Sequence, residues 1–371
     1  MDMDENTRTF QESSFTYNYL LDFVNYYPEY DYIMSVGDGV SIENLITQYK
    51  ETDWQFIKRL ASHFNSFLVP EDTSGNVRYY FGMPKRSSSS NIDPISYKVK
   101  KDVEEYVYKT NNDVDGLIEN DATYYIVEER TIREIGDTVV FNGKNLYVYS
   151  VKTELIGQEL KHFYHLKSEN GFKRKHYFND KIIGASLDGN VTDVKQDIVQ
   201  IHAKVDPIQD DAGTRWFAYS TVYSQPDGSG WYAMPEIGDE IRLYFPSEKE
   251  EDSYVISSVH LEVSNGVDRT NPNFKSIKNI YGKEVLFTET TLLLTNNKGM
   301  SILIDDEHGI FINSDKDVTI SADGSIMVTS LENQFIISAE NAIVLNQDDT
   351  HIILKDDIVF SGTQIAVQEK E

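Results

Sequence analysis

The chain has 371 residues, 40% of them hydrophobic, and can therefore form two or three domains with real cores. Its 34 basic and 61 acidic residues give a net charge of −27, which repels nucleic acids and anionic lipids and argues against DNA or RNA binding. The absence of cysteine excludes disulfides and thiolate metal sites. The acidic start Met1–Glu5 is unlike a signal peptide, and no apolar run approaches the ~18 residues of a membrane span.

The N-terminal part of the chain mixes helical and strand patterns. The aromatic and leucine-rich segment Tyr17–Tyr27 predicts a helix, and Ser41–Phe67 carries the clearest helical pattern. Within that segment, Thr52 and Gln55 have the spacing of a capping box. The apolar residues that follow share one helical face: Trp54, Ile57, Leu60, Ala61 and Phe64. An aromatic run at Val77–Met83 predicts a strand.

From about residue 95 to 183 the sequence alternates polar and apolar residues, as in a β-barrel or sandwich. Strands are expected at Tyr106–Tyr108, Tyr124–Val127, Thr138–Phe141 and Tyr147–Val151. The dipeptide Asn142-Gly143 between two of them is typical of a hairpin turn. We therefore predict one domain over residues 1–183, either a β-barrel or an α+β fold.

A second domain is predicted for residues 184–262. Its strands are expected at Ile198–Lys204, Trp216–Val222, Glu240–Phe245 and Tyr254–His260, joined by turns rich in Gly, Pro and Asp. About five strands in a segment of this length suit a small closed barrel of the OB type. The polar segment 263–280 is a predicted linker.

Residues 281–371 repeat pairs of apolar residues at positions i and i+2, with successive pairs about eight residues apart. The predicted interior positions are Ile302, Ile304, Ile310, Ile312, Val318, Ile320, Ile326, Val328, Phe335, Ile337, Ile343 and Leu345. The repeat continues through Ile352/Leu354, Ile358/Phe360 and Ile365/Val367. Such a short unit cannot bury its own apolar face, so we expect a β-helical needle wound from identical copies of the chain.

Residues that could support catalysis or metal binding do not form a convincing set. Asn111–Gly116 resembles half of a calcium loop, but its twelfth position is Ala122, where bidentate coordination needs Glu. Asp305–His308 lies where the apolar repeat requires a turn. His162 and His165 are three apart in a predicted strand and would point to opposite faces. We therefore predict no catalytic residues, no metal site and no cofactor.

Two stretches of the sequence resemble one protein family. Gln48–Ala61 resembles the Q-Y-x-E-S/T-D-x-x-F-L-x-R-L signature of the VgrG and phage late-control-D family, the hub and spike proteins of contractile tails and type VI secretion. The matching residues are Gln48, Tyr49, Glu51, Asp53, Phe56, Arg59 and Leu60. The stretch from Trp216 to Phe245 looks like the OB domain of the spike, with matches at Trp216, Pro235, Gly238 and Asp239.

The resemblance implies a mainly β homotrimer with a hub domain, an OB-fold barrel and a C-terminal triple-stranded β-helix. It implies tail-tube and baseplate proteins as partners on the N-terminal side, a separate tip protein at the C-terminus, and a target cell envelope. Such a protein is structural. It is made in the bacterial cytoplasm without a signal peptide and assembled into a virion or virion-like particle. One departure is that only residues 1–47 precede Gln48, so the first barrel of the hub is expected to be shortened and completed by another protein.

Two other classes of protein remain open at this point. A receptor-binding tail fibre or tailspike would bind or depolymerise glycans, but right-handed β-helix tailspikes use coils of roughly twenty residues or more, against about eight here. A secreted enzyme with β-rich accessory domains would need an acid, base or metal constellation that the sequence lacks.

Overall fold

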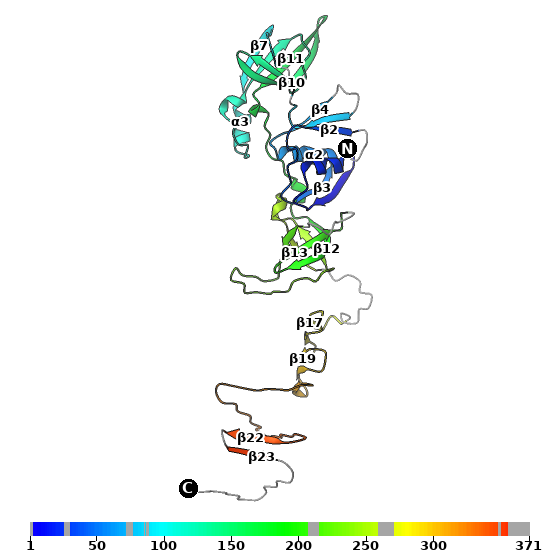
Figure 1. The fold of residues 1–371 in the computed structure, drawn as a ribbon, viewed down its shortest axis with the longest axis vertical. Helices are drawn as coiled ribbons and strands as arrows, with labels where there is room; N and C mark the ends of the chain where they lie inside the picture. The colour runs from blue at the N-terminus through cyan, green and yellow to red at the C-terminus, as the bar shows by residue number, and fades with distance from the viewer. Residues whose placement is uncertain are drawn as a thin grey trace. The chain divides into compact units, whose positions relative to one another are not determined.

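The computed structural model describes residues 3–25, 30–71, 77–84, 86, 89–206, 215–258, 271–347 and 350–354. The fold is mainly β, as the sequence predicts, and consists of several mostly antiparallel sheets with a few short helices; β2 with β5 and β6 with β9 pair parallel (Figure 1). The chain divides into two compact units, Met1–Val263 and Ser264–Glu371. The predicted boundaries at 183/184, 262/263 and 280/281 remain predictions.

The N-terminal part of the first unit is an α+β arrangement. Its elements are β1 (Glu5–Phe10), α1 (Tyr17–Val24), β2 (Tyr30–Met34), β3 (Ile46–Thr52), α2 (Asp53–Ser62), β4 (Leu68–Glu71) and β5 (Val77–Phe81). Strand β1 pairs antiparallel with β3, while β5 lies between β2 and β4 in a separate sheet. Both helices bury their apolar faces in one core, in which Leu20, Phe56 and Phe81 are fully buried. The described residues before Gln48 include β1, α1 and β2 but no barrel of their own.

The predicted helices are confirmed in position, but one is much shorter than expected. Helix α1 lies within the predicted segment Tyr17–Tyr27, whose last two residues are outside the described part of the chain. Within Ser41–Phe67, the helix begins only at Asp53, because Thr52 caps it and the preceding residues form β3. Pairing with β1 gives the backbone of β3 the hydrogen bonds that a longer helix would have supplied.

The middle part of the first unit is a six-stranded sheet with the order β6-β9-β10-β11-β8-β7. Its strands are β6 (Ser89–Asn91), β7 (Ser96–Lys101), β8 (Thr123–Glu129), β9 (Thr138–Phe141), β10 (Lys144–Ile156) and β11 (Glu159–Lys167). Strands β6 and β7 are consecutive in sequence but lie at opposite edges of the sheet. Tyr97 of the edge strand β7 nevertheless contacts Phe141 of β9, near the other edge, with ring centroids 5.3 Å apart. The sheet therefore curls toward a barrel. Both residues of the predicted Asn142-Gly143 turn have positive φ, as a tight hairpin requires.

One predicted strand of this part is wrong. Residues Tyr106–Tyr108 belong to helix α3 (Val103–Thr110), which begins after the cap Asp102 and contains an ion pair between Glu105 and Lys109. The local cap and the i,i+4 pair favour a helix despite the β-type composition. Short 3-10 turns complete the first unit at Glu119–Ala122, Asn170–Phe172, Asp180–Ile182 and Glu250–Asp252.

The last part of the first unit is a five-stranded sheet with the order β14-β13-β12-β15-β16. Its strands are β12 (Ser186–Lys195), β13 (Ile198–Ala203), β14 (Trp216–Ala218), β15 (Glu240–Tyr244) and β16 (Tyr254–Ile256). A parallel bridge between Tyr219 and Val255 joins the two edge strands and closes the ring. Five strands closed in this order are compatible with a barrel of the OB type. The interior is apolar and includes Val199, Ile201, Leu243 and Phe245.

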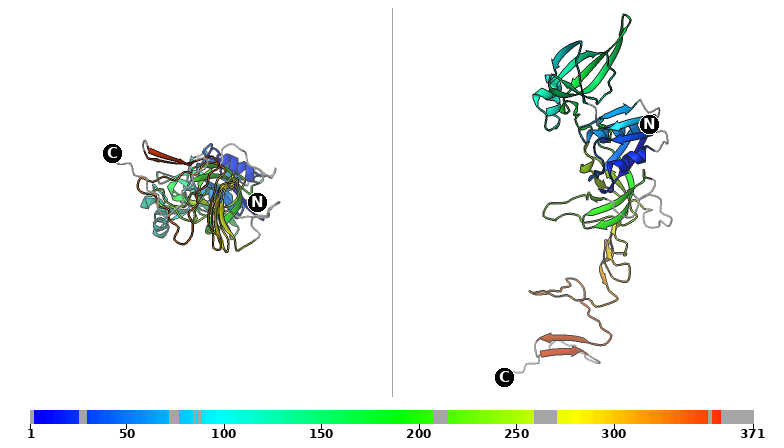
Figure 2. Two further views of the ribbon diagram at one scale, coloured as in Figure 1. Left: turned by 90° about the horizontal axis from the view of Figure 1, so that it is seen from below. Right: turned by 45° about the horizontal axis from the view of Figure 1, so that its top comes forward.

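The second unit begins with a meander of five antiparallel strands in sequence order. These are β17 (Lys275–Lys278), β18 (Glu284–Phe287), β19 (Thr291–Thr295), β20 (Ser301–Asp305) and β21 (Gly309–Asn313). A hairpin of β22 (Ile343–Gln347) and β23 (Thr350–Leu354) follows after a long segment without strands (Figure 2). Of the predicted repeat, the side chains of Ile352/Leu354 and the two last pairs lie outside the described residues. The predicted strands at Val318/Ile320, Ile326/Val328 and Phe335/Ile337 do not form, and no described strand pairs with these residues.

Candidate functional site: a buried charge cluster and an apolar sheet

The segment that carries the first family-like motif lies where β3 turns into α2. The side-chain oxygen of Thr52 accepts a hydrogen bond from the amide of Gln55 at 3.2 Å, and the side chain of Gln55 accepts one from the amide of Thr52 at 3.2 Å. This capping box is the one that the sequence predicts. It fixes a sharp turn, and the charged residues before and after the turn are thereby brought together.

Arg59 is the centre of a buried charge cluster. Its guanidinium donates to both oxygens of Glu51 through Nε and to one through Nη2, and Nη1 donates to Glu250 at 2.9 Å. Nη2 also donates to the backbone carbonyl of Thr47 at 2.7 Å. Burial alone would lower the pKa of Arg59, but the carboxylates of Glu250 and Glu51 outweigh burial and raise it. The arginine is therefore held permanently charged between two acids.

Asp53 forms the second half of the cluster. One of its carboxylate oxygens accepts hydrogen bonds from Arg8 at 3.0 Å, Asn6 at 3.1 Å and the fully buried Gln48 at 3.0 Å. The other motif residues pack: Phe56 and Leu60 are fully buried in the N-terminal core, and Tyr49 lies against the core of the five-stranded barrel. Asp53 thus ties β1 to the start of α2, and it does not cap the helix with its side chain.

The cluster joins the N-terminal α+β part to the barrel. Glu250, which is 191 residues away from Arg59 in sequence, also accepts a hydrogen bond from the amide of Thr47 at 3.2 Å. On the β1 side, the amide of Thr9 donates to Asp206 at 2.7 Å. Leu45 completes the connection by packing into the barrel core. Arg59, Glu51, Glu250 and Asp53 each have a partner of opposite sign, so the arrangement is suited to holding these two parts of the first unit together.

The second motif lies at the turn into β15. Trp216 is half-buried at the start of β14, and Pro235 is buried. Gly238 has a φ of +94°, and its amide donates to the carbonyl of Val191 at 2.8 Å. The carboxylate of Asp239 accepts from the amide of Glu236 at 2.9 Å, which closes the turn. These residues position β15, whose Ile241 and Leu243 point into the barrel.

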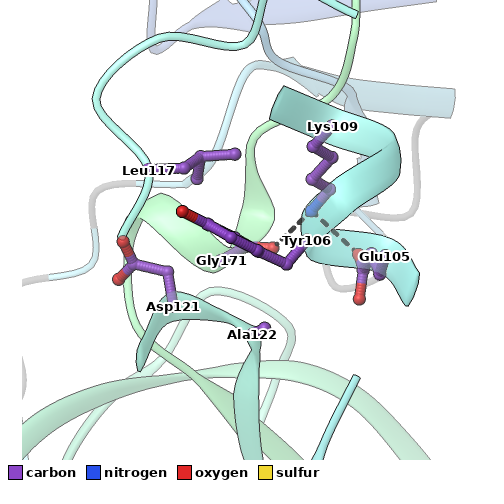
Figure 3. A pocket seen from close by; sticks show the side chains of 7 residues that line it. All are labelled: Glu105, Tyr106, Lys109, Leu117, Asp121, Ala122 and Gly171. Atoms are coloured by element: carbon purple, nitrogen blue, oxygen red, sulfur yellow. Dashed lines mark hydrogen bonds and ion pairs between the residues drawn. The ribbon is translucent and has the colours of Figure 1, made fainter. Parts of the chain in front are cut away.

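Beside the six-stranded sheet, α3 and its neighbours line a small pocket (Figure 3). Lys109 points across it and donates to the carbonyl of Gly171 at 2.9 Å, and it pairs with Glu105 at 2.8 Å. Lys167 pairs with the same carboxylate at 2.8 Å. Burial lowers the pKa of Lys109. Both ammonium groups therefore have partners inside the protein.

Neither a metal site nor a membrane helix is found among the residues that the structure describes. Within the described ranges, no group of three or more His, Asp or Glu side chains could hold a metal ion. No helix in the described part of the chain is long and apolar enough to cross a membrane. Asn111–Gly116 and Asp305–His308 both lie in turns, and Asp305 accepts hydrogen bonds from the amides of Glu307 and His308.

In the second unit, the apolar repeat produces a sheet without a core. Cross-strand neighbours bring apolar residues directly opposite one another, as in Leu294 with Ile302, Ile302 with Ile312, and Ile304 with Ile310. None of the residues 271–346 is buried. All ten predicted interior positions from Ile302 to Ile337 are exposed, with exposed fractions between 41% for Ile304 and 73% for Ile320. Leu345 is also exposed, and Ile343 is half-buried. In the single chain these residues are an apolar surface and not a core.

Comparison with known proteins gives similarity at the level of structure. No protein-family model matches the sequence, and no curated protein matches it. The structure is similar to the E. coli c3393 protein, described as a component of the type VI secretion system with structural similarity to the T4 bacteriophage tail proteins gp27 and gp5. The two share 12% identity with a TM-score of 0.47, over 70% of this chain and 75% of that one. A PdpA–VgrG complex of Francisella is similar at 10% identity and a TM-score of 0.46, over 84% of this chain and 69% of the other.

Proposed function

We propose that the protein is the structural hub and membrane-puncturing spike of a contractile injection machine such as a phage tail, a phage-tail-like bacteriocin or a type VI-like system. Three copies would assemble through residues 281–371 into a needle. The observation that carries the proposal is the second unit, in which the regularly spaced Ile, Val, Leu and Phe residues between 302 and 345 are exposed, except for the half-buried Ile343.

The free energy of hydrophobic burial supports self-association of this unit. Each Ile or Val side chain contributes about 1.5–3 kcal/mol when it is moved from water into an apolar interior. The exposed positions recur with a nearly constant step, so identical chains can place equivalent residues in the same layer along the whole array. Neighbouring copies would also supply the strand partners that Val318, Ile326 and Phe335 lack in the single chain.

The joint around Arg59 fits a mechanical role in the first unit. Force applied to one part of this unit would pass through the buried ion pairs from Arg59 to Glu51 and Glu250. In the proposed particle, the first unit would contact the tail tube and baseplate proteins. The C-terminal end would carry a separate tip protein and meet the target cell envelope. The protein would be made in the bacterial cytoplasm and would act without catalysis.

The solution mass of two proteins tests the proposal. The full chain is expected to have a mass near three times its 42.6 kDa, and a truncated chain that ends at Asn279 is expected to associate weakly or not at all. Sedimentation equilibrium or light scattering gives both masses, and electron microscopy of the full chain should show a thin spike. A monomeric mass for both proteins would contradict the proposed trimer.

A pair of adjacent substitutions tests which face is interior. Ile320→Asp places a carboxylate in the predicted interior and repeats it three times in one layer, so it should abolish or strongly weaken assembly. Thr319→Asp adds the same charge at the alternate position, which a strand directs to the opposite face, and should leave the mass unchanged. Equal effects of the two substitutions would contradict the proposed needle.

A further inference from the structure

The six-stranded sheet and the five-stranded barrel are joined by residues 173–179, an extended stretch that we call the connecting segment. It lies against the C-terminal end of α2. The amide of Arg174 donates to the carbonyl of Asn65 at 2.8 Å, and the side-chain amide of Asn65 donates to the carbonyl of Arg174 at 2.9 Å. The amide of Tyr177 donates to the hydroxyl of Ser62 at 2.9 Å. These hydrogen bonds attach the connecting segment to α2.

Two histidine rings meet where the connecting segment contacts α2. His63 is the last, capping residue of α2, and its ring centroid lies 4.5 Å from that of His176 in the connecting segment. His176 also stacks on Phe178, with centroids 4.4 Å apart and an interplanar angle of 7°. Nδ1 of His63 shares a hydrogen bond of 2.8 Å with the hydroxyl of Tyr17. The histidine pair is therefore part of the contact that holds the segment in place.

The other ring nitrogen of His63, Nε2, is buried and has no hydrogen-bond partner among the described residues. If Nδ1 accepts the proton of Tyr17, Nε2 carries a hydrogen that has no acceptor; if Nδ1 donates to Tyr17, Nε2 has a lone pair without a donor. A neutral ring thus leaves one hydrogen bond unmade. A protonated ring would leave a buried N–H donor of a charged group unpaired, which costs more. The site is therefore built for a neutral histidine.

The groups that face His63 also favour the neutral ring. They are the hydroxyl of Tyr17 from α1, the guanidinium of Arg59 from α2 and the ring of His176 from the connecting segment. Burial, together with His176 and Arg59, lowers the pKa of His63 well below its ordinary 6.5. Burial and Arg59 lower the pKa of His176 as well. Protons are therefore bound less readily by both rings in this arrangement than by free histidines.

Two carboxylates lie close enough to influence Tyr17. Burial raises the pKa of Tyr17 to about 12, and the carboxylates of Glu250 and Glu43 add to this effect. Glu250 is already paired with Arg59 at 2.9 Å. Within the described ranges neither carboxylate bonds to a ring nitrogen of the histidine pair. A proton on either ring would therefore lack a direct carboxylate partner.

We propose that the connecting segment is a pH-sensitive contact that stays attached to α2 at neutral pH and detaches in acid. Detachment lets water reach Nε2 of His63 and separates the two rings, so that each can take up a proton. Because detachment is coupled to proton uptake, acid favours the detached state. For one histidine with a pKa of 6.5 when detached, the equilibrium constant for attachment falls by up to about 30-fold between pH 7.5 and 5.0.

Detachment does not require either neighbouring part to unfold. The N-terminal α+β part and the six-stranded sheet each have a buried apolar core of their own. Acid would therefore loosen the six-stranded sheet from α2 while both remain folded. The proposal concerns the first unit alone and does not depend on the proposed needle.

Hydrogen exchange followed by mass spectrometry tests the proposal in the full-length protein. Peptides that cover residues 173–179 contain the amides of Arg174 and Tyr177, whose protection reports the attached state. After correction for the chemical exchange rate, this protection should fall at least about tenfold between pH 7.5 and 5.0. Peptides of the β10–β11 hairpin are the internal reference and should keep their protection.

Three variants assign the effect to the histidine pair. His63→Phe and His176→Gln each remove one titrating ring and should reduce the pH effect. The double variant His63→Phe/His176→Gln should leave less than about a twofold change. The matched control is His165→Gln, which removes a half-buried histidine of the six-stranded sheet whose pKa is also lowered by burial. It should keep the full effect.

Equal protection of residues 173–179 at pH 7.5 and 5.0 would overturn the proposal. A loss of the same size in the β10–β11 peptides would also overturn it, because the whole domain would then be opening. An undiminished pH effect in the double variant would show that other groups are responsible. The pH series of the unsubstituted protein decides whether the segment detaches even if a variant fails to fold.

Discussion

Replacing Arg59 with methionine gives the sharpest prediction about the joint in the first unit. Methionine keeps most of the apolar stem but removes the guanidinium, which bonds to Glu51, Glu250 and the carbonyl of Thr47. The side chains of Glu51 and Glu250 are only 9% and 12% exposed, so water cannot replace the lost cation. Removal of one partner from a buried ion pair costs about 3–5 kcal/mol, and we expect Arg59→Met to lower the free energy of unfolding by about that amount.

Hydrogen exchange of the amides of α2 in the full-length protein measures this free energy locally, without a global unfolding transition. The matched control is Lys58→Met, because Lys58 precedes Arg59 on the same helix and is exposed; its effect should stay within about 0.5 kcal/mol. The double variant Arg59→Met/Glu250→Gln should lower the free energy of unfolding by less than the sum of the two single effects. The difference should be about 0.5–3 kcal/mol, because Arg59 and Glu250 are in contact. A folded Arg59→Met protein that loses less than about 1 kcal/mol would refute the reasoning.

Three further predictions concern stability. Burial, together with the nearby His176 and Arg59, lowers the pKa of His63 below its ordinary 6.5, so the unfolded chain binds the extra proton more readily than the folded one. The free energy of unfolding should therefore fall as the pH drops below 6.5, by up to about 1.4 kcal/mol per pH unit. Urea titrations at several pH values would detect this slope. A pH-independent stability in this range would contradict that account. Gly37→Ala should destabilise more than Gly39→Ala, because both have positive φ but only at Gly37 would the new Cβ lie 2.5 Å from an aromatic ring; equal melting temperatures would argue against this packing. Thr52→Ala removes the N-terminal cap of α2 and should lower the free energy of unfolding by about 1 kcal/mol, which thermal unfolding can measure. An unchanged melting temperature would mean that water replaces the cap.

Local chemistry explains what the sequence could predict. The capping box at Thr52 and the Asn142-Gly143 turn depend on neighbouring residues only, and both form as predicted. The alternation of Ile241, Leu243 and Phe245 likewise places all three inside the barrel. Such features need no knowledge of distant parts of the chain.

Long-range pairing explains what the sequence could not predict. The segment before Thr52 has helical periodicity, but it becomes β3 because β1 is available to pair with it. The sequence could not identify Glu250 as the partner of Arg59, because 191 residues separate the two and Glu250 lies in an ordinary acidic run. The strands predicted at Val318 and Phe335 have no neighbouring strand among the described residues and carry no regular structure there.

The unburied strands of the second unit also have a consequence for biosynthesis. Residues 264–371 leave the ribosome after the first unit, and at 5–20 residues per second they take roughly 5–20 s to synthesise. The first unit, with its own buried cores, has time to fold during that interval. In the proposed trimer, nascent chains on neighbouring ribosomes would present matching copies of the apolar strands at a high effective concentration, which favours correct pairing over aggregation. Synthesis of this unit after the first unit would thus shorten the time for which its exposed apolar strands are without their proposed partners.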